Sequence, residues 1–87
     1  MNNKDKIKKI LVEFLKSGNP LISELKNIPM DKSLVELGYL DSFGVVELVS
    51  FIEKKFNVEI YDDEITKEKF GSINKMIDLI SKKQNIG

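Results

Sequence analysis

The residues that could do chemistry in this chain are few, and the pair Asp41-Ser42 is the most informative of them. Gly38 and this polar pair precede a segment whose apolar residues recur at three- and four-residue spacing, as on one face of a helix. Ser42 is therefore expected at or next to the N-cap of that helix. At such a place the first backbone amides have no partner within the helix, and the helix dipole is positive. An anion esterified to the Ser42 hydroxyl would be well placed there.

The composition excludes several other chemistries. The chain has no cysteine and no histidine, which removes disulfides, thiolate nucleophiles, most transition-metal sites and the usual general base. Ser42 consequently has no visible activating partner, so a serine hydrolase is disfavoured. The sequence predicts no catalytic residue and no metal site.

The charges balance overall but are unevenly distributed along the chain. Fourteen lysines match fourteen acidic residues, so there is no global bias toward nucleic acid or an anionic membrane. Residues 33–64 hold two lysines against eight acids, a net charge of −6, while the segments on either side are each +3. The acidic segment could steer basic partner surfaces toward Ser42, or it could be a solvated face with ordinary fluctuation in sign.

No apolar run approaches the roughly 18 residues that a membrane span requires, and no charged-then-apolar secretory start is present. We therefore expect a cytoplasmic protein without membrane insertion. At 87 residues, the chain is expected to form one domain over 1–87, with an ordered core of about 4–82.

The apolar pattern predicts a first helix over residues 4–16 that ends at Ser17-Gly18. Asn19 and Pro20 are suited to begin a short helical turn. The connection from Ser17 to Leu40 is too long to be structureless in so small a domain. Its apolar residues are therefore expected to pin it onto the helices, and these are Leu21, Leu25, Ile28, Leu34 and Leu37.

The second helix is expected over residues 42–56. Its inward residues are predicted to be Val45, Leu48, Val49, Ile52 and Phe56. Its outward flank holds Phe43, Glu47 and Ser50, with Val46 at the margin. An aromatic residue on a polar face is either partly in the core or an anchor for partner proteins, and both interpretations of Phe43 stay open here.

Residues 57–60 alternate like a strand but have no second strand to pair with, so we expect an extended connection with Val58 and Ile60 buried. The acids at 62–64 suit the start of a short third helix with Ile65 facing inward. Ser72 is expected to cap the last helix, and residues 84–87 to fray. The predicted fold class is therefore all-α: an antiparallel four-helix bundle of three main helices and one short helix, with a long first connection.

The residues Asp41, Ser42 and Phe43, within LGYLDSFGVVELVSFIEKKFNVEI, strongly resemble the attachment motif of the acyl and peptidyl carrier protein family, especially the D-alanyl carrier type. The resemblance covers roughly residues 33–80. It implies a 4′-phosphopantetheine arm attached to Ser42, with Asp41 helping a phosphopantetheinyl transferase to recognise the site. It also supports Phe43, Val46, Glu47 and Ser50 as partner-binding residues.

The resemblance implies a non-catalytic, monomeric carrier that holds an acyl or aminoacyl group as a thioester. Its expected partners are the transferase, a loading ligase and a downstream acyltransferase or synthase. Two departures from fatty-acid synthesis carriers, Phe43 in place of the commoner leucine and a net charge of zero, favour a specialised carrier for D-alanylation, nonribosomal peptide assembly or surface-polymer modification. The alternative is a small helical protein–protein interaction module in which Ser42 is only a helix cap.

Overall fold

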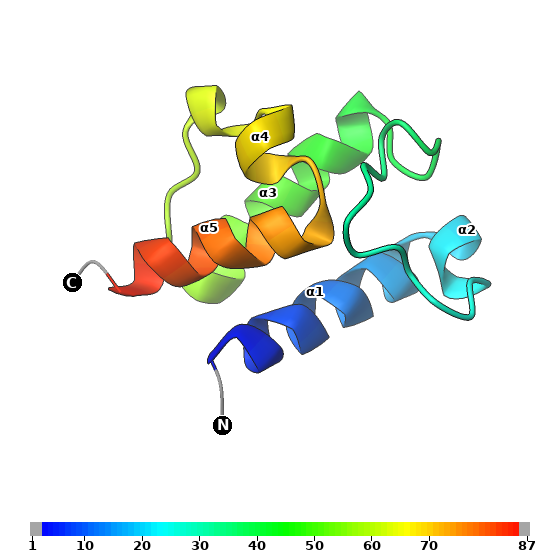
Figure 1. The fold of residues 1–87 in the computed structure, drawn as a ribbon, viewed down its shortest axis with the longest axis horizontal. Helices are drawn as coiled ribbons and strands as arrows, with labels where there is room; N and C mark the ends of the chain where they lie inside the picture. Colours follow the sequence, from blue (N-terminus) through cyan, green and yellow to red (C-terminus); the bar gives the residue numbers. More distant parts are fainter. Residues whose placement is uncertain (1–2, 86–87) are drawn as a thin grey trace.

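The computed structural model describes residues 3–85, and over these it contains helices and no strand. The elements in order are α1 (Asn3–Gly18), α2 (Pro20–Ser23), α3 (Ser42–Phe56), the 3₁₀ turn η1 (Asp62–Glu64), α4 (Lys67–Phe70) and α5 (Ile73–Asn85). Figure 1 shows that α1 runs opposite to both α3 and α5. The predicted all-α bundle with a long first connection is confirmed.

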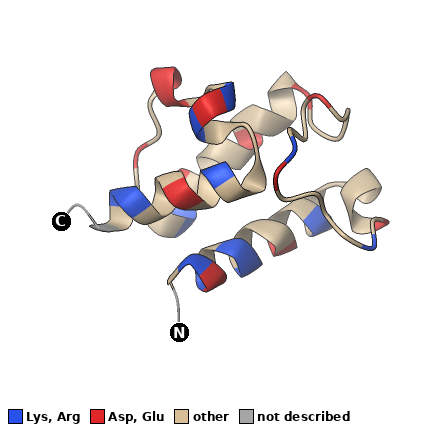
Figure 2. Cartoon of the chain, in the orientation of Figure 1, with Lys and Arg blue, Asp and Glu red and all other residues tan. Residues whose placement is uncertain are grey.

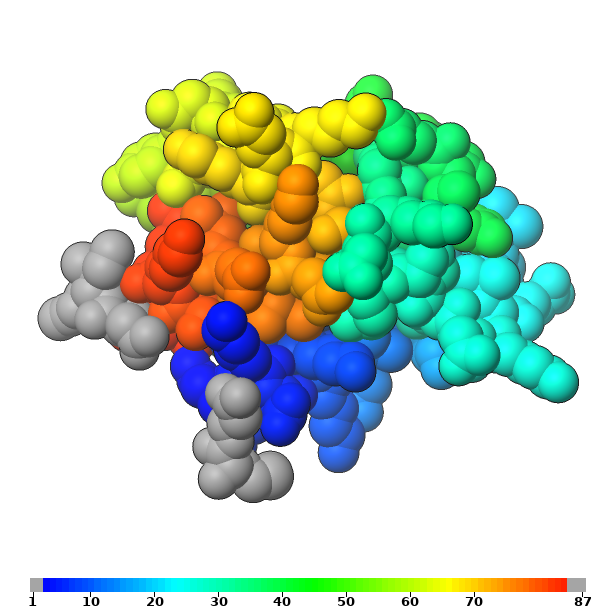
Figure 3. All heavy atoms as spheres, in the orientation of Figure 1, coloured from blue at the N-terminus to red at the C-terminus, as the bar shows by residue number. Residues whose placement is uncertain are grey.

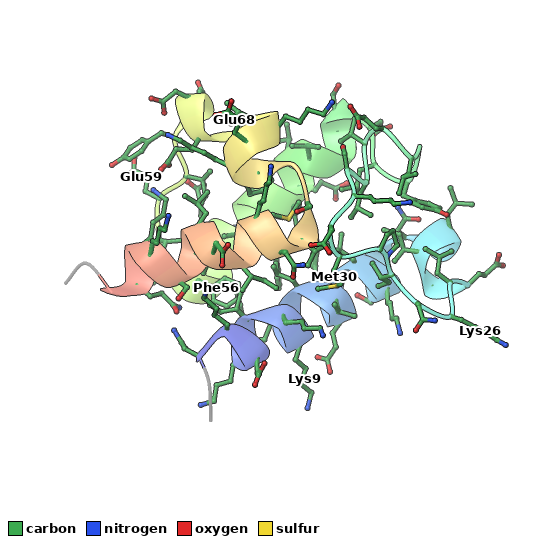
Figure 4. All side chains as sticks on the ribbon, viewed as in Figure 1. Lys9, Lys26, Met30, Phe56, Glu59 and Glu68 are labelled. Carbon is green, nitrogen blue, oxygen red and sulfur yellow. The ribbon has the colours of Figure 1, made fainter. Side chains whose placement is uncertain are left out.

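One apolar cluster holds the elements together, and it contains residues from every α-helix. Its fully buried side chains include Ile7, Leu11, Ile22, Leu34, Leu48, Ile52, Ile73 and Ile80. The Phe14 and Phe51 rings stack between α1 and α3 with centroids 3.9 Å apart. Figure 4 shows Met30 and Phe56 pointing inward, while Lys9 and Lys26 point away from the bundle. The inward faces that the periodicity predicted are therefore the faces that form the core.

Asn19 organises the start of the first connection. Its side-chain Oδ1 accepts hydrogen bonds from the backbone amides of Leu21, at 2.9 Å, and Ile22, at 3.2 Å. Pro20 follows as the first helical residue, so the predicted short helical turn is confirmed. The Asn19 Nδ2 also donates to the Tyr39 carbonyl at 2.6 Å. One side chain thus ties the beginning of the connection to its end.

Asn74 anchors the middle of the same connection. Its backbone amide donates to the Met30 carbonyl at 3.0 Å, and its side-chain Nδ2 donates to Asp31 Oδ1. Figure 3 shows this part of the connection lying directly against the start of α5. The connection is therefore a fixed part of the domain, as its length led us to expect.

The apolar residues that pin the connection are only partly those predicted. Three are buried or half-buried, namely Leu25, Ile28 and Leu34. The predictions for Leu21 and Leu37 are wrong, because these side chains are 56% and 46% exposed. In α2 the inward position is taken by Ile22, whose neighbour Leu21 then points outward.

A tight turn explains the exposure of Leu37. Gly38 has φ 86, a left-handed conformation that glycine adopts at little cost. The turn folds back so that the amides of Tyr39 and Leu40 both donate to the Leu34 carbonyl, at 2.9 and 3.2 Å. Leu34 is thereby drawn into the core, and Leu37 lies on the outside of the turn.

The second connection, residues 57–66, departs from the prediction in two places. Asn57 ends α3 in the left-handed conformation, with φ 54. Ile60 is buried as expected, whereas the prediction for Val58 is confirmed only in part, because this residue packs against the core but is half-buried.

The short third helix also begins later than predicted. Residues 62–64 form only the 3₁₀ turn η1, after which Ile65 packs against the core as expected. The α-helical turn is α4, and its N-cap is Thr66, whose Oγ1 accepts from the Lys69 amide at 3.2 Å. The run of acids was therefore the wrong start signal, and the threonine after it is the right one.

The last helix starts as predicted, since Ser72 Oγ accepts from the Lys75 amide at 3.2 Å. It continues to Asn85, so the expected fraying is wrong for residues 84 and 85. Gln84 is held by a 2.7 Å hydrogen bond from Asn3 Nδ2. The same expectation for residues 86 and 87 lies outside the described part of the chain. Among residues 3–85, no helix is long and apolar enough to cross a membrane.

Candidate functional site

Ser42 is the first residue of α3, and Asp41 is its N-cap. The Asp41 Oδ1 accepts from the Gly44 amide at 2.8 Å, and the Asp41 carbonyl accepts from the Val45 amide at 3.0 Å. Ser42 therefore lies next to the cap, one of the two predicted positions. Because Asp41 performs the capping, the cap role that the alternative interpretation gave to Ser42 is wrong.

The Ser42 hydroxyl is available for chemistry. Ser42 is exposed, and no group within residues 3–85 hydrogen-bonds to its side chain. The amides of Ser42 and Phe43 precede the first intrahelical hydrogen bond, so they face outward from the helix end. A phosphate ester on this oxygen would meet unpaired amides and the positive end of the helix dipole. The exposed hydroxyl therefore fits a phosphopantetheine ester.

Gly44 gives the cap the room that it needs. A Cβ at this position would lie 3.0 Å from Leu40 Cδ2 and 3.4 Å from Asp41 Oδ1. A larger residue would press on the half-buried Leu40 and on the capping carboxylate. The glycine thus allows the loop to enter α3 with Asp41 and Ser42 held in place.

The four predicted partner-binding residues lie together on the outward strip of α3. Phe43 and Val46 are 71% and 65% exposed, and Glu47 and Ser50 are also exposed. The interpretation of Phe43 as a partial core residue is therefore wrong, and Val46 is fully on the outer face rather than at its margin. Two large apolar side chains stand in water next to Ser42, which is unusual away from an interaction surface.

A cavity that periodicity could not reveal opens beside Ser42. It has a volume of about 440 Å³ and lies between α3, α4 and the end of the first connection. Its apolar lining includes Leu34, Val45, Ile65, Phe70 and Met76. The ion-paired side chains of Glu36 and Lys67 also line it. The residues come from four separate segments, so only the folded chain brings them together.

The acidic middle segment does not form one acidic face. Glu36 pairs with Lys67, and Glu64 pairs with Lys83 at 2.8 Å. Figure 2 shows the acids gathered around η1, whereas most of α3 is uncharged. Around the start of α3 the exposed acidic side chains without an ion-pair partner among the described residues are Asp41 and Glu47, whereas Glu36 beside the Ser42 cavity is paired with Lys67. Any electrostatic steering at this helix must therefore depend on a small number of carboxylates.

Glu64 is the one described residue whose pKa is clearly displaced. Burial raises its pKa, but the ion pair with Lys83 and the hydrogen bond from the Tyr61 amide outweigh this effect, so the pKa lies below its usual value. Lys83 also lies over the Tyr61 ring, 4.8 Å from its centroid. These contacts fasten the second connection to α5, away from Ser42.

A small helical bundle with an exposed Asp-Ser pair at a helix start is the architecture of a carrier domain. Comparison with known proteins agrees. The family described as "Phosphopantetheine attachment site" matches residues 5–80. The acyl carrier protein of Buchnera aphidicola subsp. Schizaphis graminum is 37% identical over an alignment of 89 residues. The alignment covers 95% of this chain and 96% of that protein.

Two D-alanyl carrier proteins are similarly related. That of Leuconostoc citreum is 35% identical over 71 residues, covering 82% of this chain and 87% of the relative. That of Streptococcus equi subsp. zooepidemicus is 39% identical over 56 residues, covering 64% and 71%. The chain belongs to the phosphopantetheine-binding carrier protein family. It is a non-catalytic carrier of acyl or aminoacyl groups, and its prosthetic group is covalently attached 4′-phosphopantetheine.

Proposed function

We propose that Ser42 carries the 4′-phosphopantetheine arm and that cargo is held on the arm as a thioester. The observation that carries this proposal is the free, exposed hydroxyl at the first residue of α3, with the cap supplied by Asp41. The arm supplies the thiol that a chain without cysteine lacks. A flexible tether at an exposed helix start lets one cargo reach several enzymes at high effective concentration.

The other serines are less suited to modification. Ser72 and Ser81 are buried, and the Ser17 and Ser23 hydroxyls donate to backbone carbonyls of their own helices. Ser50 is the useful comparison, because it is exposed on the same helix as Ser42 but is preceded by Val49 rather than by an aspartate.

The test is intact-mass analysis after incubation with coenzyme A and a phosphopantetheinyl transferase. Wild type should gain the mass of one phosphopantetheine. Ser50→Ala should gain the same mass, and Ser42→Ala should gain none. Modification of Ser42→Ala would show that the arm is attached elsewhere.

Asp41 is proposed to help the transferase recognise the site. Its Oδ1 accepts the Gly44 amide, and no second hydrogen bond to this carboxylate is found within residues 3–85. The other carboxylate oxygen therefore remains available beside the Ser42 hydroxyl. Phe43, Val46, Glu47 and Ser50 are proposed to contact partner enzymes, because all four are exposed on one strip of α3.

The proposed partners are the transferase, a loading ligase and a downstream acyltransferase or synthase, with the protein acting as a cytoplasmic monomer. The relatives carry the names of two cargo classes, acyl and D-alanyl. Loading of the phosphopantetheine-bearing protein from a panel of fatty acids and amino acids would separate these classes. Sedimentation velocity would test the monomer.

A further inference from the structure

A second hollow lies on the side of α3 that faces α1 and α2. We call it the α1–α3 groove, and it has a volume of about 560 Å³. Its lining includes Phe14, Gly18, Leu21, Tyr39, Phe43 and Glu47. Two of these, Leu21 and Phe43, are large apolar side chains that are 56% and 71% exposed. The groove is distinct from the cavity beside Ser42, which lies toward α4.

The charges around the groove are of one sign. Asp41 and Glu47 line it, and none of the described residues that line it is a lysine. A third hollow, beside the exposed Leu37, has a lining of mixed charge, with Asp31 and Glu36 beside Lys32, Lys67 and Lys75. A cationic side chain is therefore attracted to the α1–α3 groove more than to the hollow at Leu37.

Leu21 is held rigidly in its exposed position. Its backbone amide donates to Asn19 Oδ1 at 2.9 Å, and Asn19 Nδ2 donates to the Tyr39 carbonyl at 2.6 Å. Tyr39 lines the same groove. An exposed apolar residue on a fixed backbone loses little freedom when it is covered, which favours its use in binding. Leu21 could not be assigned this role from the pattern, which placed it in the core.

We infer that the transferase that modifies Ser42 seats a segment in the α1–α3 groove, with an apolar side chain between Leu21 and Phe43 and an arginine or lysine toward Asp41 and Glu47. This inference rests on the proposed function of Ser42. The groove reaches Asp41, the residue before Ser42, so an enzyme seated there is adjacent to the hydroxyl that it modifies. The groove extends the contact surface from α3 to α2.

The experiment compares two identical changes, Leu21→Ala and Leu37→Ala, at leucines of similar exposure. Binding is measured by calorimetry to the transferase in a Ser42→Ala background, in which the groove is intact and no modification occurs. Leu21→Ala should weaken binding by about tenfold, as expected for an apolar anchor at an interface. Leu37→Ala should stay within about twofold, as for a residue outside the contact.

The same two changes are also compared in the protein that retains Ser42, where the kinetics of modification separate binding from chemistry. Leu21→Ala should raise the KM for modification by a similar factor and leave kcat nearly unchanged, because it removes binding and not chemistry. Thermal unfolding should be the same for both variants, which excludes a folding defect as the cause.

The inferred contact between a basic residue of the transferase and Glu47 is tested separately. Glu47→Gln should weaken binding and reduce its dependence on salt, because one attractive charge is removed. Equal effects of the two leucine changes, or weaker binding only with Leu37→Ala, would overturn the inferred docking in the groove. Ser42 would remain the proposed attachment site. Absence of modification at Ser42 in the wild-type protein would overturn both.

Discussion

The two connections on either side of α3 are held by different chemistry, although each places one aliphatic side chain in the core. Leu34 in the first connection is 2% exposed, and Ile60 in the second is 6% exposed. The first connection is fastened at its ends and middle by two asparagines, Asn19 and Asn74, and it also carries the exposed ion pair of Glu36 with Lys67. In the second connection the polar contacts come from carboxylates, because Glu53 accepts from the Ile60 amide at 2.9 Å and Glu64 pairs with Lys83.

This difference separates the link that Asn19 makes to the loop before Asp41 from the titration of Glu64. The hydrogen bond from Asn19 to the Tyr39 carbonyl, two residues before Asp41, involves no ionisable group. The ion pair of Glu64 titrates, but it fastens η1 to α5 on another part of the molecule. The link between Asn19 and the Tyr39 carbonyl should therefore keep its geometry over a pH range in which the ion pair of Glu64 weakens.

The largest expected effect tests whether the first connection belongs to the core. Leu34→Ala should lower the free energy of unfolding by about 2 to 4 kcal/mol, because it leaves a cavity at a buried site. Leu37→Ala, three residues away and 46% exposed, should cost less than about 0.5 kcal/mol. Urea denaturation of both variants measures the difference. Equal costs would mean that the connection is not pinned as the structure shows.

Periodicity predicted the three long helices because their inward faces repeat at a fixed spacing. It failed in the first connection because an irregular segment has no such repeat. Leu34 and Leu37 are equivalent in the sequence pattern, and only the turn at Gly38 decides which of them is buried. Leu21 was misassigned for the same reason, since Ile22 beside it takes the buried position in α2.

The location of the candidate site was predicted from the sequence, but its details were not. The Asp41-Ser42 pair was placed at the start of α3, but aspartate and serine are both good N-caps, so the sequence could not decide between them. The cavity beside Ser42 and the ion pair of Glu64 with Lys83 join segments far apart in the chain. Neither leaves a local signal in the sequence.

The next effect in size concerns the asparagine that links both ends of the first connection. Asn19→Ala removes the cap of α2 and the bond to the Tyr39 carbonyl, and should cost about 1 to 2 kcal/mol. Asn19→Asp keeps the capping oxygen but loses the donor, so it should cost less. Urea midpoints at pH 7 would show this ordering. An aspartate variant as stable as wild type would mean that the Tyr39 bond contributes nothing.

The ion pair of Glu64 in the second connection should show a pH dependence that the Asn19 contact of the first connection lacks. The lowered pKa of Glu64 means that its carboxylate stabilises the fold at pH values above its ordinary pKa of 4.5, and that this stability is lost as the pH falls through the folded-state value. Glu64→Gln should cost about 1 kcal/mol at pH 7, since it removes a charge-assisted contact.

The control for this effect is the same measurement at low pH. The difference between wild type and Glu64→Gln should shrink below pH 4.5, where protonation abolishes the ion pair in the wild type. A second control needs a variant whose cost in stability does not depend on pH. Asn19→Asp cannot serve, because the introduced aspartate itself titrates. Asn19→Ala is suitable, and its cost relative to wild type should not change through that range. A constant cost for Glu64→Gln would assign its effect to packing.

The smallest effect on stability is expected on the outward strip of α3, which neither connection covers. Phe43→Ala and Glu47→Lys should each change the free energy of unfolding by less than about 0.5 kcal/mol, because both side chains are exposed.

The effects of these two changes should appear in binding kinetics with the transferase. Phe43→Ala should raise the dissociation rate by removing apolar contact area. Glu47→Lys should slow association, and added salt should reduce that difference by screening charges beyond about 8 to 10 Å. Stopped-flow measurements at two ionic strengths distinguish these outcomes, and unchanged rates for both variants would place the docking surface away from α3.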